Sequence, residues 1–174
     1  MPVAVSGCEF TMSTSSRTAL EAKFTELSSQ LRRLSDALAV VRLTASEDRP
    51  RQGDSAIADQ LEDATLDLMG LLHQAQEAIR AAQRHKGDRI DSSHAKRALN
   101  TCQGCIQKIE KQFWADLSSH ERLNALAQLG TERRGEWIPW TAAVNQAIEQ
   151  CRQPLGGVGE SLAACWQSLS SRLG

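Results

Sequence analysis

Apolar residues recur at alternating intervals of four and three residues between positions 20 and 45. This spacing predicts a long helix that presents a narrow apolar seam to neighbouring helices. Thr18 and Glu21 match a capping box at its start, and Val40 and Leu43 are expected to broaden the seam near its end. The seam itself consists of Leu20, Phe24, Leu27, Leu31, Leu34, Leu38, Val41 and Ala45.

Two further long helices follow the same rhythm. A polar loop containing Pro50 and Gly53 ends the first helix. A second helix is predicted over residues 54–86, and a third begins at Asp91. The expected seam of the second helix is Ile57, Leu61, Ala64, Leu68, Leu71, Ala75, Ala78 and Ala82. The expected inner face of the third is Leu99, Cys102, Ile106, Ile109 and Phe113.

The pattern changes after residue 116, where shorter helices are predicted. One covers residues 118–129, and a loop bracketed by Gly130 and Gly135 follows it. The next helix is expected to stop at Pro154 and Gly156–Gly157, before a last helix. The apolar stripes of these last two helices are Trp140, Val144, Ile148 and Cys151, then Leu162, Trp166, Leu169 and Leu173.

These elements predict an all-α protein. Because short polar connections make neighbouring helices antiparallel, we expect an up-down bundle of three long helices over residues 18–117. Residues 118–174 are expected to form a shorter, Trp-rich helical cap in the same domain, since so small a unit is hard to stabilise alone. Residues 1–17 are expected to be a frayed tail.

The antiparallel arrangement also makes a packing prediction. It places Ala75, Ala78 and Ala82 beside Leu20 and Phe24. The third helix starts at the same end, with the small residues Ala95 and Ala98. Phe24 must fill the space that these alanines leave, because protein interiors tolerate few voids. If Phe24 is too short, a second copy of the chain would be needed there.

The beginning of the chain imitates a lipoprotein signal. Val5-Ser6-Gly7-Cys8 resembles a lipobox, but no Lys or Arg precedes Cys8 and the apolar stretch is too short. We therefore expect a polar tail, with either Met1 or Met12 as the true start. Five cysteines in a chain long enough to build its own core argue against a disulfide framework, and a reducing cytoplasm is expected.

Charge and hydropathy argue against nucleic-acid and membrane partners. Twenty Lys and Arg balance twenty-one Asp and Glu, for a net charge of −1. Counted by segment, the net charge is +1 over residues 1–53, −3 over 54–90, +1 over 91–118 and zero over 119–174. No segment forms a dense basic footprint. No apolar run approaches the roughly 20 residues that cross a bilayer.

Cys102 and Cys105 form the most motif-like pair in the chain. A Cys-x-x-Cys spacing on a helix can supply half of a zinc site, and Cys151 and Cys165 could supply the other half. Each of these cysteines also falls on or beside an apolar stripe, where cysteine behaves as a small hydrophobic residue. We therefore expect core residues and no cofactor. The histidines match no metal motif; they are His73, His85, His94 and His120.

The glycine-rich stretch 156–161 precedes a helix and could present backbone amides to an anion. It lacks the lysine and the preceding strand of a phosphate loop, and Glu160 would repel a phosphate. We expect a turn between helices here. The sequence contains no nucleophile elbow and no dinucleotide-binding fingerprint.

A loop between the predicted cap helices combines arginine with tryptophan. Arg133, Arg134, Trp137 and Trp140 lie close together among Gly and Pro residues. Trp and Arg dominate binding hot spots, because each joins a large contact area to a directional polar group. The four residues are the candidate partner-binding site. Trp140 also begins an apolar stripe and is expected to be internal, so Trp137 is the stronger candidate for a surface anchor.

Taken together, the sequence predicts a non-enzymatic protein-interaction module that works as an adaptor, a scaffold or an accessory subunit. Its partner would be another protein, a second copy of itself, or both. The prediction depends on well-patterned helices with no convergent polar groups on any inner face. The alternative is a small-molecule or zinc sensor with a pocket between the bundle and the C-terminal helices. Its lining candidates are Trp140, Cys151, Cys165 and Trp166.

Overall fold

The computed structural model describes residues 14–47, 56–84, 92–132 and 138–173. Every regular element within these ranges is a helix, which confirms the predicted all-α class. The elements are α2 (Thr14–Ser46), α3 (Ala56–Arg84), α4 (Ser92–Gln112), the π-helix η1 (Phe113–Leu117), α5 (His120–Glu132), α6 (Ile138–Gln150) and α7 (Arg152–Leu173). Helix α2 starts before the expected capping box, and the lipobox-like sequence lies outside the described residues.

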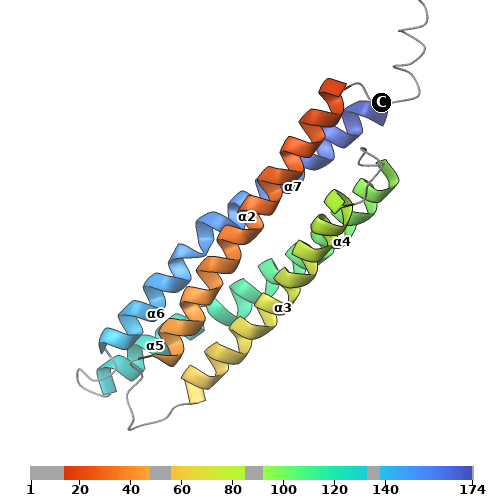
Figure 1. The fold of residues 1–174 in the computed structure, drawn as a ribbon. Helices are drawn as coiled ribbons and strands as arrows, with labels where there is room; N and C mark the ends of the chain where they lie inside the picture. Colours follow the sequence, from red (N-terminus) through yellow and green to blue (C-terminus); the bar gives the residue numbers. More distant parts are fainter. Residues whose placement is uncertain (1–13, 48–55, 85–91, 133–137, 174) are drawn as a thin grey trace, which may run out of the picture.

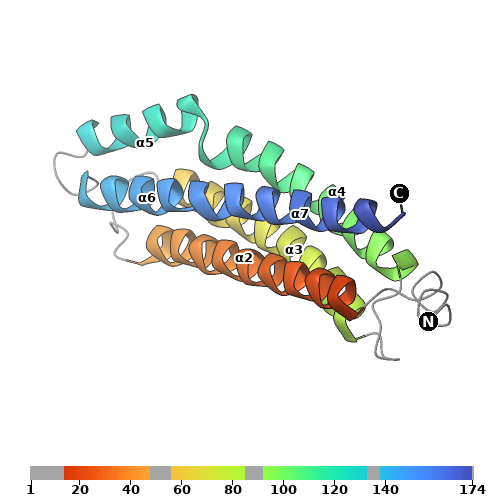
Figure 2. The same ribbon diagram turned by 90° about the horizontal axis from the view of Figure 1, so that it is seen from above.

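Helix α2 lies between two sets of helices. It packs against α3 on one side and against α6 and α7 on the other. Helix α4 packs against both α3 and α7, so these helices enclose a common core. The chain runs along the long axis in α2, returns in α3, runs forward again in α4 and returns in α6 and α7 (Figure 1). Helices α6 and α7 follow one another along α2 (Figure 2).

The seam of α2 is confirmed residue by residue, because all eight predicted members are fully buried. The expectation that Val40 and Leu43 broaden this seam is wrong. Their side chains are 45% and 52% exposed. Both positions lie on the side of the helix opposite the seam, since they fall about half a turn away from Val41 and Ala45.

The buried face of α3 is rotated from the predicted one. Its fully buried residues are Ala58, Leu61, Thr65, Leu68, Leu72, Ala75, Ile79 and Ala82. At every second position of the predicted seam, the buried residue is the next one along the chain. For example, Leu72 is buried, whereas the predicted Leu71 is half-buried. The predicted seam residues Ile57, Ala64 and Leu71 are partly buried and pack against the margin of the core.

The inner face predicted for α4 is confirmed, with all five of its members buried. The stripe predicted for α6 is also buried, from Trp140 to Cys151. Phe24 is fully buried together with Ala75 and Ala95, so the space between the small residues is closed within one chain. The structural reason to expect a second copy at that point therefore disappears.

The C-terminal part of the chain differs most from the prediction. The expected stop at Pro154 and Gly156–Gly157 is wrong, because α7 runs through these residues. Pro154 is the third residue of α7, where its missing N–H has no helical acceptor to lose. Only Cys151 separates α6 from α7, and its amide N–H donates to the Ile148 carbonyl over 3.0 Å.

The predicted division into three long helices and a short cap is not confirmed. Helix α7 has 22 residues and α4 has 21, so the last helix is slightly longer than the third predicted long helix. Helix α5 also runs past Gly130, where a loop was expected, and ends at Glu132. The N-cap of α5 is Ser119, whose hydroxyl oxygen accepts the Arg122 amide N–H over 3.1 Å, so the helix begins slightly later than the start predicted at residue 118.

The glycines of α7 provide a stability test with an internal control. A Cβ added at Gly156 would meet nothing within 4 Å, whereas one at Gly157 would lie 2.5 Å from Oε1 of Gln30. We expect Gly156→Ala to raise the free energy of unfolding by about 0.5–1 kcal/mol, because alanine loses less backbone entropy in a helix. Gly157→Ala should gain less, since Gln30 must move. Urea unfolding of both variants measures the difference, and equal effects would contradict this account.

Candidate functional site

The interior that the structure describes is almost entirely apolar. Its buried polar side chains are Thr65, Ser118, Thr141 and Ser161. Thr65 donates to the Leu61 carbonyl over 2.6 Å, and Thr141 donates to the Leu126 carbonyl over 3.1 Å. These hydroxyls therefore satisfy backbone acceptors inside the core. Among the described residues, no three His, Cys, Asp or Glu side chains are grouped to hold a metal ion.

Cys102, Cys105, Cys151 and Cys165 are buried free thiols. Burial raises the pKa of Cys102 to about 12, and the neighbouring thiols of Cys105 and Cys165 add to the shift. Burial likewise raises the pKa of Cys151 to about 12 and that of Cys165 to about 11. Since only the thiolate is a strong nucleophile or metal ligand, this environment favours the role of core residues.

The raised thiol pKa values predict a loss of stability at alkaline pH. Protonated thiols are favoured in the fold, so this stabilisation is fully present below the unfolded thiol pKa of about 8.5. It is lost as the pH rises towards the folded pKa of about 12 for Cys102 and Cys151. We expect the unfolding free energy to fall between about pH 8.5 and 10.

A double variant, Cys102→Ala with Cys151→Ala, isolates this effect. Its unfolding free energy should fall less steeply over the same pH range, whatever the cost of the substitutions themselves. Urea unfolding at several pH values gives both slopes. Parallel slopes in the variant and the wild type would show that the thiols do not cause the loss.

The predicted Trp and Arg site divides between the core and a part of the chain outside the described residues. Trp140 is 4% exposed, and its indole N–H donates to the Ala45 carbonyl over 3.2 Å. It therefore holds α6 against α2 and does not form a surface anchor. Arg133, Arg134 and Trp137 lie outside the described residues. Of the lining predicted for a sensor pocket, Cys151 and Cys165 are buried and Trp166 packs against the core.

A different pair of Trp and Arg residues meets at the corner after α4. The Ser118 amide donates to the Phe113 carbonyl over 2.8 Å, which closes the π-helix η1. Trp114 in this turn is 48% exposed, and the Arg152 guanidinium stacks 4.5 Å from its ring centre. Arg152 also donates to the Ser118 hydroxyl over 2.7 Å, and its Nε lies 2.6 Å from Oε2 of Glu149.

Sequence analysis did not find this corner, because 38 positions separate Trp114 from Arg152 in the chain. The one available signal was that Trp114 follows Phe113 and falls off the inner face of its helix. The corner joins η1 to the start of α7.

The corner can be tested through Arg152. We expect Arg152→Ala to lower the free energy of unfolding by about 1–2 kcal/mol, because it removes a charged hydrogen bond and a cation–π contact. Arg152→Lys keeps the charge but loses the planar fork, so its effect should be intermediate. Urea unfolding of both variants checks the order. A lysine variant as destabilised as the alanine variant would mean that the charge contributes nothing.

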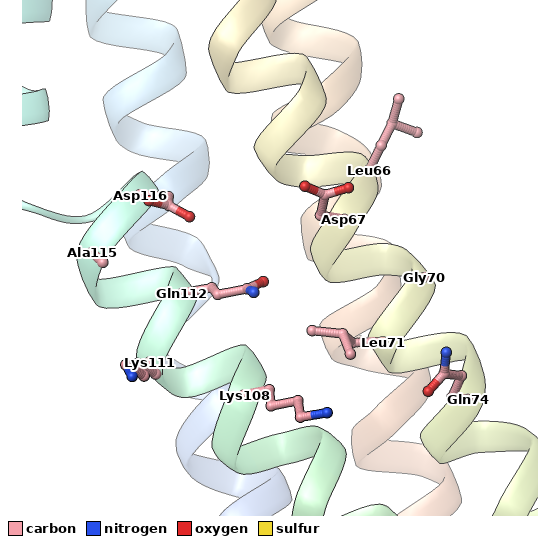
Figure 3. A pocket seen from close by; sticks show the side chains of 10 residues that line it. All are labelled: Leu66, Asp67, Gly70, Leu71, Gln74, Lys108, Lys111, Gln112, Ala115 and Asp116. Atoms are coloured by element: carbon pink, nitrogen blue, oxygen red, sulfur yellow. The ribbon is translucent and has the colours of Figure 1, made fainter.

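A surface groove of about 840 Å³ lies between α3 and α4 with η1. We call it the α3–α4 groove. Leu71 and Asp67 point into it from α3, and Lys108, Gln112 and Asp116 point into it from the other wall (Figure 3). The rest of its lining is Leu66, Gly70, Gln74, Lys111 and Ala115.

The charges of the α3–α4 groove are sorted by position. Asp67 and Asp116 lie at one end, and Lys108 lies at the other (Figure 3), one helical turn from Lys111. Within the described residues, no ion pair joins any of these four side chains to another charged group. Leu66 lines the groove from the outer side of α3, where its side chain points away from the α4 wall (Figure 3), and it is 45% exposed. The groove thus combines a few apolar lining residues with four charged side chains that have no ion-pair partner among the described residues.

Comparison with family models, with curated proteins and with solved structures gave no match to this chain. Within the described helices, no stretch combines the length and the apolar character needed to cross a membrane.

Proposed function

We propose that this chain is a non-enzymatic protein-interaction module, an adaptor or accessory subunit that docks on a protein partner through the outer surface of its helices. The observation that carries the proposal is the α3–α4 groove with its unpaired charges. Exposed charges can be matched by complementary charges of a partner, and exposed apolar side chains beside them can add contact area on binding.

The division between interior and surface supports the same proposal. Inner faces of the described helices are apolar, and the buried thiols have raised pKa values. Several large apolar side chains face outward instead. They are Val40, Leu43, Leu66, Trp114 and Ile138. Single exposed apolar residues are common, so Leu66 matters because it borders the groove.

Two leucines with similar exposure allow a matched test. Leu66 lies at the groove, and Leu43 lies on the outer face of α2, with exposures of 45% and 52%. We expect Leu66→Ser to weaken partner binding at least tenfold and Leu43→Ser to leave it unchanged. Affinity capture from the native host with quantitative mass spectrometry identifies the partner, and titration of the purified partner gives the affinities.

A third variant tests the loop predicted from the sequence. If Arg133, Arg134 and Trp137 belong to the docking surface, replacing all three by alanine should also weaken binding. The captures by the wild-type chain and by the Leu66→Ser variant are compared, and a second copy of the chain counts as a captured protein. The proposal is overturned if the wild type captures no protein that the variant does not also capture. Circular dichroism of each variant verifies that the helices are intact.

The proposal includes a reducing cytoplasm as the compartment. Its support is the state of the cysteines, since Cys102, Cys105, Cys151 and Cys165 are all free. Buried unpaired thiols are compatible with a compartment in which disulfides do not form.

A further inference from the structure

We infer that the partner of the α3–α4 groove is a second copy of this chain, packed against the first about a two-fold axis perpendicular to α3 and α4. This inference rests on the proposed function and names the partner. Such an interface is isologous, so a contact between two residues across it is repeated with the roles of the two copies exchanged.

The sorted charges of the groove are self-complementary under this rotation. The Cys105 thiol donates to Oε1 of Gln74 over 3.8 Å. This contact shows which part of α3 lies beside which part of α4 at the basic end. At the other end, Asp67 and Asp116 face each other across the groove (Figure 3). A perpendicular two-fold axis exchanges the two ends. It therefore places Asp67 and Asp116 of each copy beside Lys108 and Lys111 of the other.

The same separation extends beyond the groove along both helices. Residues 56–72 contain four carboxylates and no Lys or Arg. Residues 92–106, at the opposite end of the antiparallel pair, contain Lys96 and Arg97 and no carboxylate. Both cations are exposed, as are Asp63 and Asp67. The α3–α4 layer is therefore acidic at one end and basic at the other.

Compensation of helix dipoles does not account for this pattern. Acidic groups near the start of α3 and Arg84 in its last turn agree with the helix dipole. In α4, however, Lys96 and Arg97 lie in the second turn and no acidic residue occupies the first. Positive charge near the start of α4 opposes its dipole. The sign of the charges in these stretches therefore depends on the end of the layer at which they lie and not on the direction of each helix.

The groove also leaves room for close approach. A Cβ added at Gly70 would meet nothing within 4 Å, and Ala115 lies on the opposite wall. Leu66 and Leu71 provide apolar area beside these small residues. Small residues at the centre with leucines beside them allow a helix of the second copy to settle into the groove.

The layer is large enough for a dimer. Helix α3 has 29 residues, which corresponds to a length of about 43 Å. Two neighbouring helices form a face roughly 20 Å wide. The face measures roughly 800 Å² on each copy, the size of a standard interface per partner. Because much of it is polar, we expect a dimer that weakens with added salt.

Charge reversal tests the pairing directly. In the acidic variant, Lys108→Asp and Lys111→Asp leave both ends of the groove negative. In the basic variant, Asp67→Lys and Asp116→Lys leave both ends of the groove positive. Sedimentation at low salt should show a dimer for wild type and at least a tenfold weaker one for each variant alone. An equimolar mixture of the two variants should dimerise again, because opposite charges then meet at both ends.

A chain carrying all four substitutions is the internal control. The two ends of its groove have exchanged sign, while Lys96, Arg97 and Asp63 outside the groove are unchanged, so it should dimerise with itself more strongly than either charge-reversal variant alone. Thermal unfolding confirms that each variant folds, since the four side chains are on the surface or half-buried. The inference is overturned if wild type is monomeric at high concentration, or if its dimer is indifferent to the reversals or the mixture fails to recover.

The proposed interaction module and the inferred two-fold dimer can be contradicted independently of each other. A monomeric chain that still captures a different protein through Leu66 overturns the two-fold pairing and leaves the interaction module standing. Loss of both the dimer and the capture overturns both.

Discussion

Burial of the α2 seam is the constraint on which the rest of the structure depends. Its eight apolar residues are fully buried, and each leucine among them contributes about 1.5–3 kcal/mol when removed from water. A seam of this length cannot be covered from one side. Helix α3 covers one flank, and the other flank needs a segment almost as long as the 33 residues of α2. Helices α6 and α7 meet that need together, whereas a short cap would leave half of the seam in water.

This requirement explains where sequence reasoning succeeded and where it did not. The seams of α2, α4 and α6 were predictable because each offers a single apolar path. In α3 two paths exist, since Leu71 and Leu72 are both apolar, and so are Ala78 and Ile79. The choice between them depends on where α2 and α4 lie. Pro154 and the glycines after it favour a turn locally, but packing of α7 along α2 outweighs that preference.

The surface features were beyond reach for a different reason. Trp114 meets Arg152 only because the π-helix η1 ends α4 at the point where α7 begins. The sequence predicted a patch of the same composition around Trp137, because there the residue types are adjacent in the chain. A periodic pattern identifies which side of a helix is buried. It does not identify which outward side chains of separate helices come together, since that depends on their relative register.

The arrangement of charges on the surface is another feature that the sequence alone does not reveal. A net charge of −1 suggests an electrically uniform molecule, and segment totals of −3 over residues 54–90 and +1 over 91–118 suggest only a mild imbalance. Folding reverses the direction of the chain between these segments. The acidic half of α3 and the basic half of α4 then lie at opposite ends of one layer. For the proposed docking, recognition of the partner would come from the surface, because the interior is apolar. A charge separation along a two-helix layer has its simplest complement in the same layer turned end for end.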